Sequence, residues 1–510
     1  MEKSNRLQRF LGAVERAGNA LPHPAVLFFV LAGTVIVLSG LVSALDVQAV
    51  HPVKKDLIKA VNLFSVAGLH LVITDMVKNF AGFAPLGTVL VAMLGFSVAE
   101  KSGLVSALLR LLVLKSSRRM LIPAVLFAGV LSHTAGDVGY VVLIPLAAMA
   151  FHSAGMNPLA GLAICFAGVS GGFAANILLS TADPLLAGLT QEAARIIDSK
   201  YSVSPLVNWY FMAASSFLIV GVGTLVANRI TIPFLGDYTG ASVRTAVEPL
   251  NALERRGLKW TLIVAAVLLS ALLVGLLPEN GFLRDVKDTD ILHSPVIKGV
   301  VAIIFIFGVL LGLAYGFGAK TFKSQNDIVN SMQEAMATMA PYLVLVFFAA
   351  QFISLFNASN VGLIMAIKGS EFFKELGLGP VPLMIGFILL TCLLDLVIGS
   401  ASAKWALMAP IFVPMFMLLG VSPELSQASY RIADSVVNII SPLMSYFPLI
   451  LAFANKYDPR AKVGTLVALM LPYSTAFLIA WSLMLLVWMV LGLPLGPGAQ
   501  MIYKVPVGAP

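Results

Sequence analysis

Residues 155–187 read GMNPLAGLAICFAGVSGGFAANILLSTADPLLA, and this stretch decides the fold. It is apolar enough to lie in a bilayer, but Gly, Pro, Ser, Thr and Asn interrupt it too often for a uniform lipid-facing helix. Residues 403–455 are apolar and interrupted in the same way. Free backbone groups at membrane depth are tolerated only inside protein or beside a wet cavity. Both regions are therefore predicted to be broken helices or re-entrant hairpins, the second hairpin covering about 420–455.

The two interrupted regions match each other when the sequence is shifted by 265 positions. Gly and Pro have defined backbone roles, so their coincidence carries more weight than shared apolar residues. The coinciding pairs include Gly155 with Gly420, Pro158 with Pro423, Pro145 with Pro410, Ser170 with Ser435 and Ser180 with Ser445. Loop charges place the start of the first copy, near residue 80, outside and the start of the second copy, near residue 345, inside. The copies are therefore predicted to be an inverted-topology repeat.

Composition places the rest of the chain in the membrane as well. Of 510 residues, 59% are hydrophobic and 11% are charged, whereas a soluble protein has about 25% charged residues. Clear apolar spans cover 25–45, 80–99, 121–151, 209–228, 259–278, 296–318, 341–366, 380–399 and 464–492, and 104–116 and 325–337 are expected to be short amphipathic helices on the inner face. The prediction is an all-α polytopic membrane protein with about nine transmembrane helices and two re-entrant helical hairpins.

The net charge of +8 is informative once it is placed along the chain. Through residue 340, alternate loops carry 16 Lys and Arg and the intervening loops carry 9, so the N-terminus is expected in the cytoplasm. The basic clusters are read as orientation signals near lipid headgroups, and no nucleic-acid partner is expected. The predicted organisation is a cytoplasmic N-terminal segment (1–24), a first half with the first hairpin (25–228), a cytoplasmic loop (229–258), a second half with the second hairpin (259–492) and a C-terminal tail (493–510).

An inverted repeat with broken helices is typical of a secondary transporter, which binds substrate and coupling ions near the bilayer midplane. A duplicated bundle without a transport role is the structural alternative. A membrane-embedded hydrolase would need a nucleophile–base pair or a metal site, and the sequence offers no convincing one. A channel is disfavoured because unwound helices in inverted repeats indicate alternating access. The protein is therefore not expected to be an enzyme, and no cofactor is expected beyond a coupling cation.

Six ionisable residues lie within the apolar regions, where each costs at least about 2.5 kcal/mol at a helix centre. They are Asp137, Asp183, Asp395, Lys404, Arg431 and Asp434. Arg431 and Asp434 are three residues apart and so share one helical face. They could form a buried ion pair that only neutralises itself. Alternatively, Arg431 presents its planar fork to a substrate carboxylate, and Asp434, with Ser435 and Asn438 nearby, offers oxygens to Na+ or accepts a proton.

The remaining polar positions also have a structural and a functional interpretation. Asp183 precedes a proline, which is typical of a helix N-cap, and a cap at a half-helix end can also touch substrate. Asn176 could contribute from the other arm of that hairpin or form an interhelical hydrogen bond. His133 and Asp137 are spaced as a hydrogen-bonded pair, for which a structural role is favoured.

A second group of polar positions surrounds residues 399–405. Ser402 lies where small residues let a backbone turn or approach a ligand, and Trp405 could stack on an aromatic ring or serve as packing. Lys404 could neutralise Asp395 across the break between them.

At these residues the chain resembles the AbgT family, the p-aminobenzoyl-glutamate transporters. The matching pieces include VKNFAGFAPLG (77–87), GFAANILLSTADPLLAG (172–188), NWYFM (208–212), WALMAPIFVPMFMLLG (405–420), YRIADS (430–435) and GLPLGPG (492–498). The resemblance implies a dimeric protein of the bacterial inner membrane. It also implies secondary transport of p-aminobenzoyl-glutamate, a folate breakdown product, and some relatives are linked to export of sulfonamide antimetabolites.

The resemblance also assigns site residues. The family's functional aspartate in the first hairpin falls on Asp183, and its second-half site residues fall on Ser402, Trp405, Pro423, Arg431, Asp434 and Pro442. A further sodium-site position falls on Asp395, where some relatives carry Asn. With Asn176 as a further substrate contact and Asn438 as a further candidate Na+ ligand, these residues form the predicted site.

Two directions of transport remain open. Import of a dianion against an inside-negative potential needs coupling, because each charge costs about 2.3 kcal/mol per 100 mV. The first hypothesis is therefore Na+- or H+-coupled uptake of aminobenzoyl-glutamate or a related aromatic anion. The second is efflux of sulfonamide-type drugs on the same scaffold, which does not need that coupling.

Overall fold

The computed structural model describes residues 22–50, 56–114, 117, 120–135, 139–238, 249–285, 290–291 and 294–504. Almost all of the predicted segment 1–24, together with Asp137, lies outside the described residues. Within the described part, eight helices are long and apolar enough to cross a membrane, or up to nine if one bent pair is counted as a single span. The predicted class, an all-α polytopic membrane protein, is confirmed.

The described elements follow one another as helices, with one short hairpin of strands. In the first half they are α2 Pro24–Ala44, β1 Gln48–Val50, β2 Leu57–Lys59, α3 Val66–Ala81, α4 Ala84–Lys101, α5 Leu104–Leu114, α6 Leu121–Leu131, α7 Ile144–Ser153, α8 Pro158–Phe166, α9 Ala182–Ala194, α10 Trp209–Val226 and α11 Ile232–Leu235. In the second half they are α12 Ala252–Leu276, α13 Pro295–Lys298, α14 Val300–Ala319, α15 Gln325–Thr338, α16 Ala340–Ala358, α17 Val361–Glu375, α18 Pro380–Asp395, α19 Ala401–Leu418, α20 Pro423–Asn438, α21 Phe447–Asn455 and α22 Val463–Leu491.

The repeat inferred from the sequence is present as the same local backbone conformation at two places in the chain. Gly155 and Gly420 both adopt a left-handed conformation, with φ of 74° and 82°, which glycine adopts without strain. Each closes the preceding helix with the same two hydrogen bonds, from Gly155 and Met156 to His152 and Phe151, and from Gly420 and Val421 to Met417 and Phe416. After each glycine a capped helix starts at a proline, Pro158 for α8 and Pro423 for α20. The helices α9 and α21 also start at positions 265 apart.

Both predicted hairpins are interrupted helices. In the first, α8 continues as a wider π-helical turn to Gly171, the chain is non-helical over 172–181, and α9 follows. In the second, α20 ends at Asn438, the chain is unwound over 439–446, and α21 follows. The predicted interruption over the whole of 403–455 is too broad, because α19 runs without a break through Pro410 and Pro414 to Leu418.

Three predicted spans are divided in the structure. The span 121–151 consists of α6, a 3₁₀ turn over Ser132–Ala135, a π-helical turn over Gly139–Leu143 and α7. The span 80–99 is represented by α3 and α4, which meet at Gly82. The span 341–366 is divided after Ala358, where Asn360 takes a left-handed conformation before α17. Apolar composition predicts membrane depth in these regions, whereas the turn residues decide where each helix stops.

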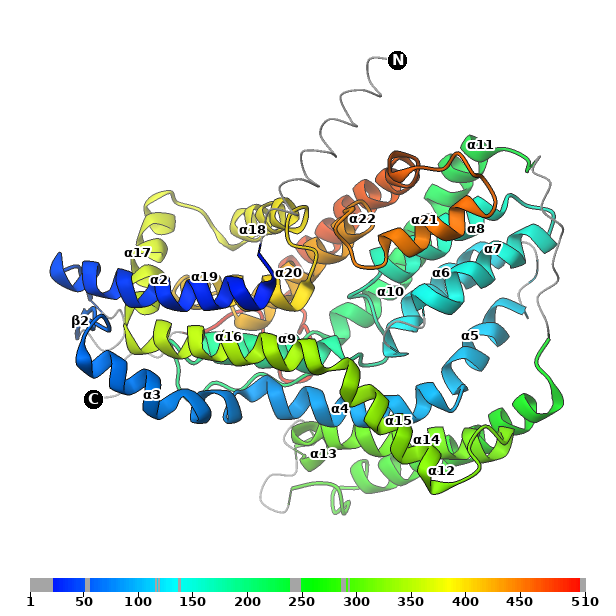
Figure 1. Cartoon of the computed structure of the whole chain (residues 1–510), viewed down its shortest axis with the longest axis horizontal. Helices are drawn as coiled ribbons and strands as arrows, with labels where there is room; N and C mark the ends of the chain where they lie inside the picture. Colours follow the sequence, from blue (N-terminus) through cyan, green and yellow to red (C-terminus); the bar gives the residue numbers. More distant parts are fainter. Residues whose placement is uncertain are drawn as a thin grey trace.

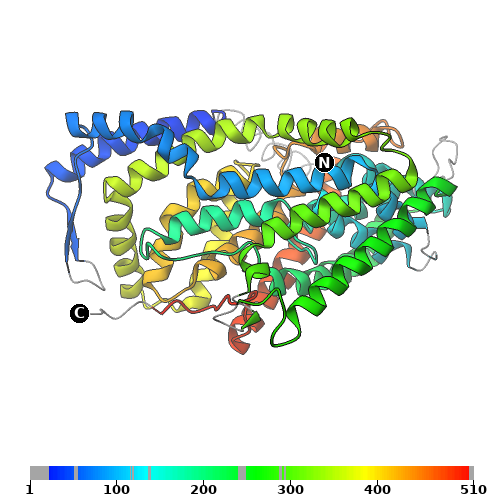
Figure 2. The same cartoon turned by 90° about the horizontal axis from the view of Figure 1, so that it is seen from below.

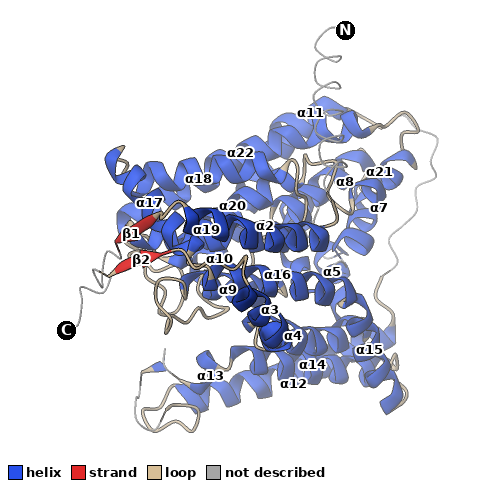
Figure 3. Ribbon diagram, turned by 60° about the vertical axis from the view of Figure 1, so that its left-hand side comes forward, coloured by secondary structure: helices blue, strands red, loops and turns tan. Residues whose placement is uncertain are grey.

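Of the interrupted helices, α9 and α20 lie in the middle of the molecule, and α8 and α21 lie toward the end where α7 and α11 are found (Figure 1). All nine residues of α8 and all sixteen residues of α20 are buried. The helices α12 and α14 pack together along one edge, where α14 also packs on α4, while α2 and α16 pack together on another face (Figure 2). The small sheet of β1 and β2 lies at one end of the molecule, next to α17 (Figure 3).

Candidate functional site

The two unwound segments of the second half touch each other beside the first hairpin. A Cβ added at Gly399, in the break before α19, would lie 2.8 Å from the carbonyl oxygen of Leu443, in the break after α20. The first hairpin is fastened to α20, because the backbone N–H of Ala174 donates to Ser435 Oγ at 3.0 Å. Side chains from both copies of the repeat therefore converge on α20.

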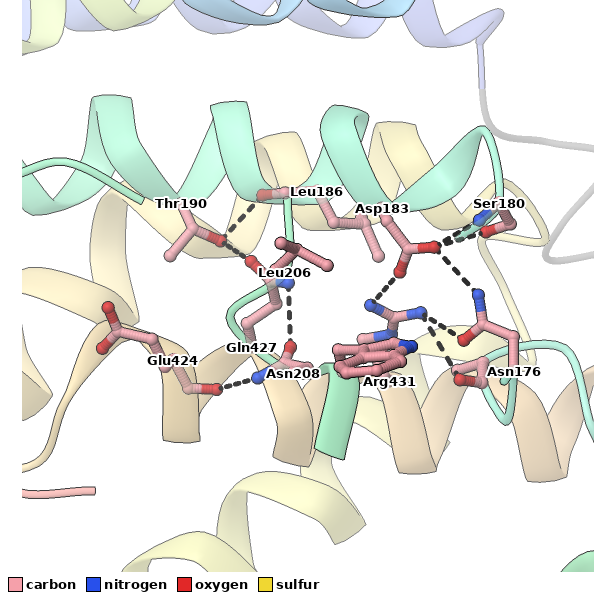
Figure 4. Close-up of polar contacts among 12 residues, drawn as sticks. Asn176, Ser180, Asp183, Leu186, Thr190, Leu206, Asn208, Glu424, Gln427 and Arg431 are labelled. Atoms are coloured by element: carbon pink, nitrogen blue, oxygen red, sulfur yellow. Dashed lines mark hydrogen bonds and ion pairs between the residues drawn. The ribbon is translucent and has the colours of Figure 1, made fainter. Parts of the chain in front are cut away.

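Asp183 and Arg431 form a buried ion pair between the copies (Figure 4). Arg431 Nη1 lies 2.6 Å from Asp183 Oδ1, and Nη2 donates to the oxygens of Ala174 and Asn176 at 3.4 Å each. The other carboxylate oxygen, Asp183 Oδ2, accepts from Asn176 Nδ2 at 2.8 Å and from the backbone N–H and hydroxyl of Ser180 at 2.6 and 2.9 Å. The carboxylate is thus fully hydrogen-bonded, which a charge this deeply buried requires.

Two details of this pair differ from the sequence interpretation. Arg431 forms its ion pair with Asp183 and Asp434 forms its own with Lys404, so the self-neutralising pair of Arg431 with Asp434, one of the two alternatives left open by the sequence, is not formed. The helix α9 begins at Ala182 with Thr181 as its N-cap, so Asp183 is the second helical residue rather than the cap. Its side chain nevertheless binds the backbone N–H of Ser180 in the manner of a cap.

A second charged cluster surrounds the start of α19. The ammonium of Lys404 pairs with Asp395, at the end of α18, and lies 2.9 Å from Asp434 Oδ1 on α20. These three side chains are 0%, 0% and 2% exposed. Asp434 also accepts from the Tyr430 hydroxyl at 3.4 Å and from Asn438 Nδ2 at 3.3 Å. The pairing of Lys404 with Asp395 that the sequence suggested is present, and Asp434 joins it.

A cavity of about 310 Å³ opens between the first hairpin, α4, α16 and the start of α19. Thr181 and Ala182 from the start of α9, and Ala401 and Ser402 from the start of α19, line it. Its other walls are apolar or aromatic: Val89, Met93, Phe173, Leu185, Leu186, Met339 and Tyr342. Two helix N-termini therefore meet one apolar cavity, and the dipole of a helix gives its N-terminus roughly +0.5 elementary charge.

The other predicted site residues contact neighbouring parts of the protein and do not line the cavity. Trp405 is 0% exposed, donates from Nε1 to Thr190 Oγ1 at 2.9 Å and packs on the Tyr430 ring with centroids 4.5 Å apart. Pro423 is the first residue of α20, and Pro442 lies in the unwound segment that follows α20. Among the predicted positions, Ser402 is the one that lines the cavity directly.

Sequence reasoning missed a chain of buried polar residues that runs from Thr190, the partner of Trp405, to Glu424 (Figure 4). The Thr190 hydroxyl lies 2.6 Å from Gln427 Oε1, Gln427 Nε2 donates to Asn208 Oδ1 at 2.8 Å, and Asn208 Nδ2 donates to the Glu424 carbonyl at 2.9 Å. The Tyr201 hydroxyl donates to the Glu424 carboxylate at 3.0 Å, and burial, with Glu424 adding to it, raises the pKa of Tyr201. The available signal was PELSQASYRIADSVVN (423–438), a polar run in an apolar chain.

Two further expectations concern His133 and metal ligands. The His133 ring binds the carbonyl oxygen of Val169, in the first hairpin, while its proposed partner Asp137 lies outside the described residues. Within the described part of the chain, no three His, Cys, Asp or Glu side chains come together as a metal-binding group.

Interrupted helices from two related halves, buried charges and an apolar cavity between them are the features of a multi-pass membrane transporter. The AbgT putative transporter family matches residues 9–503, and the chain belongs to this family. Its members are transporters and not enzymes.

Relatives and solved structures agree with this assignment. The p-aminobenzoyl-glutamate transport protein of Escherichia coli (strain K12) is 40% identical over 495 residues, which cover 97% of each chain. The Alcanivorax borkumensis YdaH transporter is 47% identical with a TM-score of 0.89, covering 93% of this chain and 100% of that one. Neisseria gonorrhoeae MtrF, whose structure illuminates a class of antimetabolite efflux pumps, is 48% identical with a TM-score of 0.91, covering 96% of this chain and 100% of MtrF.

Proposed function

We propose that this protein is a secondary active transporter of p-aminobenzoyl-glutamate in the bacterial inner membrane, with its N-terminus in the cytoplasm and driven by a Na+ or H+ gradient. The observation that carries the proposal is the cavity at which the N-termini of α9 and α19 meet. The E. coli relative, 40% identical along its length, supports the choice of substrate.

The chemistry of the cavity suits an aromatic amide with two carboxylates. The positive ends of the α9 and α19 helix dipoles favour anions without a full positive charge in the wall. Phe173 and Tyr342 provide aromatic faces, and the remaining wall is largely aliphatic. A volume of about 310 Å³ is at the lower end of the range for small-molecule sites, roughly 300–1,000 Å³.

Arg431 takes part in transport by exchanging its ion-pair partner Asp183 for a substrate carboxylate. In this structure its guanidinium is held by Asp183, next to the hairpin segment that contributes Phe173, Thr181 and Ala182 to the cavity. A substrate carboxylate that reached Arg431 would compete with Asp183 and weaken one of the contacts that hold the first hairpin on α20. Asn176, which binds both members of the pair, would move with it.

The proposed test is uptake of labelled aminobenzoyl-glutamate into proteoliposomes under an imposed Na+ or H+ gradient. Ala401→Trp fills the cavity and should abolish uptake, whereas Val267→Trp, on the 62% exposed position of α12, is the matched control and should leave uptake intact. Saturable counterflow would identify a carrier. Uptake that is unaffected by filling the cavity would overturn the proposed binding site.

Efflux of sulfonamide-type drugs is the second candidate function, and the apolar cavity wall together with the likeness to MtrF favours it. A sulfonamide shares the aminobenzene ring but lacks the glutamate. Arg431→Met should therefore impair transport of the dianion more than transport of the drug. An equal loss for both substrates would contradict a carboxylate-binding role for Arg431.

We also propose that the transporter is a homodimer, as the family resemblance implies. Light scattering on the purified protein, corrected for bound detergent, measures this directly. A mass equal to one 54.1 kDa chain would refute it.

A further inference from the structure

Lys404 and Asp395 each lie at a helix end whose dipole charge has the same sign as the side chain. Lys404 is in the first turn of α19, next to the positive end of that helix dipole, and Asp395 is the last residue of α18, at its negative end. Neither residue therefore stabilises its own helix through the dipole. Their presence needs another explanation, and the geometry of the cluster provides one.

The Lys404 ammonium lies where a small cation would be bound. It pairs with Asp395, lies 2.9 Å from Asp434 Oδ1 and is 5.6 Å from the centre of the Tyr430 ring. Carboxylate oxygens are the ligands that a hard cation prefers, and here two of them from different helices converge on one positive charge.

The same residues do not fit a Na+ ion in addition to the ammonium. The Asp395 and Asp434 carboxylates are both directed at Nζ, and a second cation among them would be repelled by Lys404 at close range in a medium of low dielectric constant. Asn438 turns its amide N–H, rather than its oxygen, toward Asp434. The two carboxylates and the ammonium have a net charge of −1, and Arg431 and Asp183 neutralise each other, so it is the occupied position of Nζ, and not the net charge, that excludes an ion between Asp395 and Asp434.

We propose that Lys404 is a tethered cation that takes the place of a coupling Na+ between Asp395 and Asp434, so that the transporter works without Na+. This inference rests on the proposed transport function and narrows its coupling ion. Lys404 is a specificity-determining residue in this proposal: it provides within the chain the charge that a dissolved ion would otherwise bring.

The first measurement needs no substrate. The melting temperature, Tm, of the purified full-length protein in detergent is compared in NaCl and in choline chloride of equal ionic strength. A ligand that binds only the folded state raises Tm, so a Na+ site would give a Na+-specific rise. We expect none for the wild-type protein, and uptake of aminobenzoyl-glutamate that is equally fast when choline replaces Na+. A Na+-specific rise in wild-type Tm would overturn the proposal.

A pair of variants at one position tests the location of the cation. Lys404→Ala keeps both carboxylates and opens the space of the ammonium, whereas Lys404→Met leaves the same charge on the cluster but fills that space. We expect a Na+-specific rise in Tm of roughly 2 °C or more for the alanine variant alone. An alanine variant that folds but ignores Na+, or a methionine variant that responds equally, would overturn the proposal. If neither variant folds, the wild-type comparison decides.

These outcomes are separable from those of the proposed function. A protein that transports no aminobenzoyl-glutamate under any gradient would refute the substrate assignment, while its Tm would still report whether Na+ binds. Conversely, substrate uptake that requires Na+ would support the substrate assignment and refute the role of Lys404.

Discussion

The helices α8 and α20 occupy the same place in the two copies of the repeat, and both are buried along their whole length. Their chemistry differs completely. The sequence of α8, PLAGLAICF, is apolar throughout, whereas α20 contains Glu424, Gln427, Arg431 and Asp434. The repeated glycine and proline frame therefore specifies the path of the backbone, and the side chains are free to diverge.

The difference shows how a polar helix can be buried at the centre of a membrane protein. The polar groups of α20 find partners in the other copy of the repeat, at Asp183, Thr190, Tyr201 and Asn208. The apolar α8 instead packs against α6 and α7. The first copy thus supplies most of the hydrogen-bond and ion-pair partners, and the second copy supplies the polar helix α20 that binds them.

The largest effect is expected at the pair of charges that joins the copies. Asp183→Leu leaves the Arg431 guanidinium buried without its carboxylate and should lower the free energy of unfolding by about 3–5 kcal/mol. Adding Arg431→Met should restore most of this stability without restoring transport. Unfolding in detergent and proteoliposome uptake measure the two effects.

The control for this prediction is the position equivalent to Arg431 in α8, which is Phe166. Phe166→Leu changes packing alone and should cost less than the loss of Asp183. A double variant as unstable as Asp183→Leu would show that the two charges do not compensate each other, and a double variant that transports would show that the pair is only structural.

A smaller effect is expected when Gln427 in α20 is replaced by leucine, or when Leu162, at the equivalent position in α8, is replaced by glutamine. Gln427→Leu leaves Thr190 and Asn208 without their buried partner and should cost about 1–3 kcal/mol. Leu162→Gln buries an amide among apolar side chains and should cost a similar amount, about 1–3 kcal/mol. Thermal unfolding of both variants tests this, and a neutral Leu162→Gln would mean that α8 can be made polar without partners.

The smallest losses of stability are expected at the two turn glycines, and the two losses should be equal. Gly155→Ala and Gly420→Ala impose a left-handed conformation on alanine, which costs about 1–2 kcal/mol. The added Cβ meets no atom within 4 Å at Gly155 and only the Tyr503 carbonyl oxygen at 3.9 Å at Gly420, so the two costs should agree. Gly33→Ala, in the helix α2 with open space around it, is the control and should be neutral or stabilising. Clearly unequal costs at 155 and 420 would contradict a shared turn.

Much of the architecture could be predicted because it depends on local sequence properties. Apolar length indicated the spans, and Gly and Pro indicated both hairpins and the repeat with its shift of 265. The spacing of the charged residues was a poorer guide to their ion-pair partners. Arg431 and Asp434 share a helical face, but each binds a partner from another helix, because contacts across a buried interface outweigh the modest stabilisation of a pair three residues apart.

The contacts that cross between the copies could not be predicted from one sequence. Nothing in the spacing of Thr190, Asn208 and Gln427 shows that they meet, since they are far apart along the chain. The sequence singled out Trp405 as a candidate substrate contact or a packing residue, but its hydrogen bond to Thr190 and its complete burial depend on how α9 lies against α19. The cavity likewise depends on two helix starts from different halves.

The polarity of α20 has a consequence for biosynthesis. A segment with Glu424, Arg431 and Asp434 is a poor substrate for the translocon, since each charge costs at least about 2.5 kcal/mol at the centre of an isolated helix. Asp183, Thr190, Tyr201 and Asn208 all precede it in the chain and are synthesised first. We expect α20 to leave the translocon onto an already inserted first half, so that the earlier copy acts as an internal chaperone for the later one.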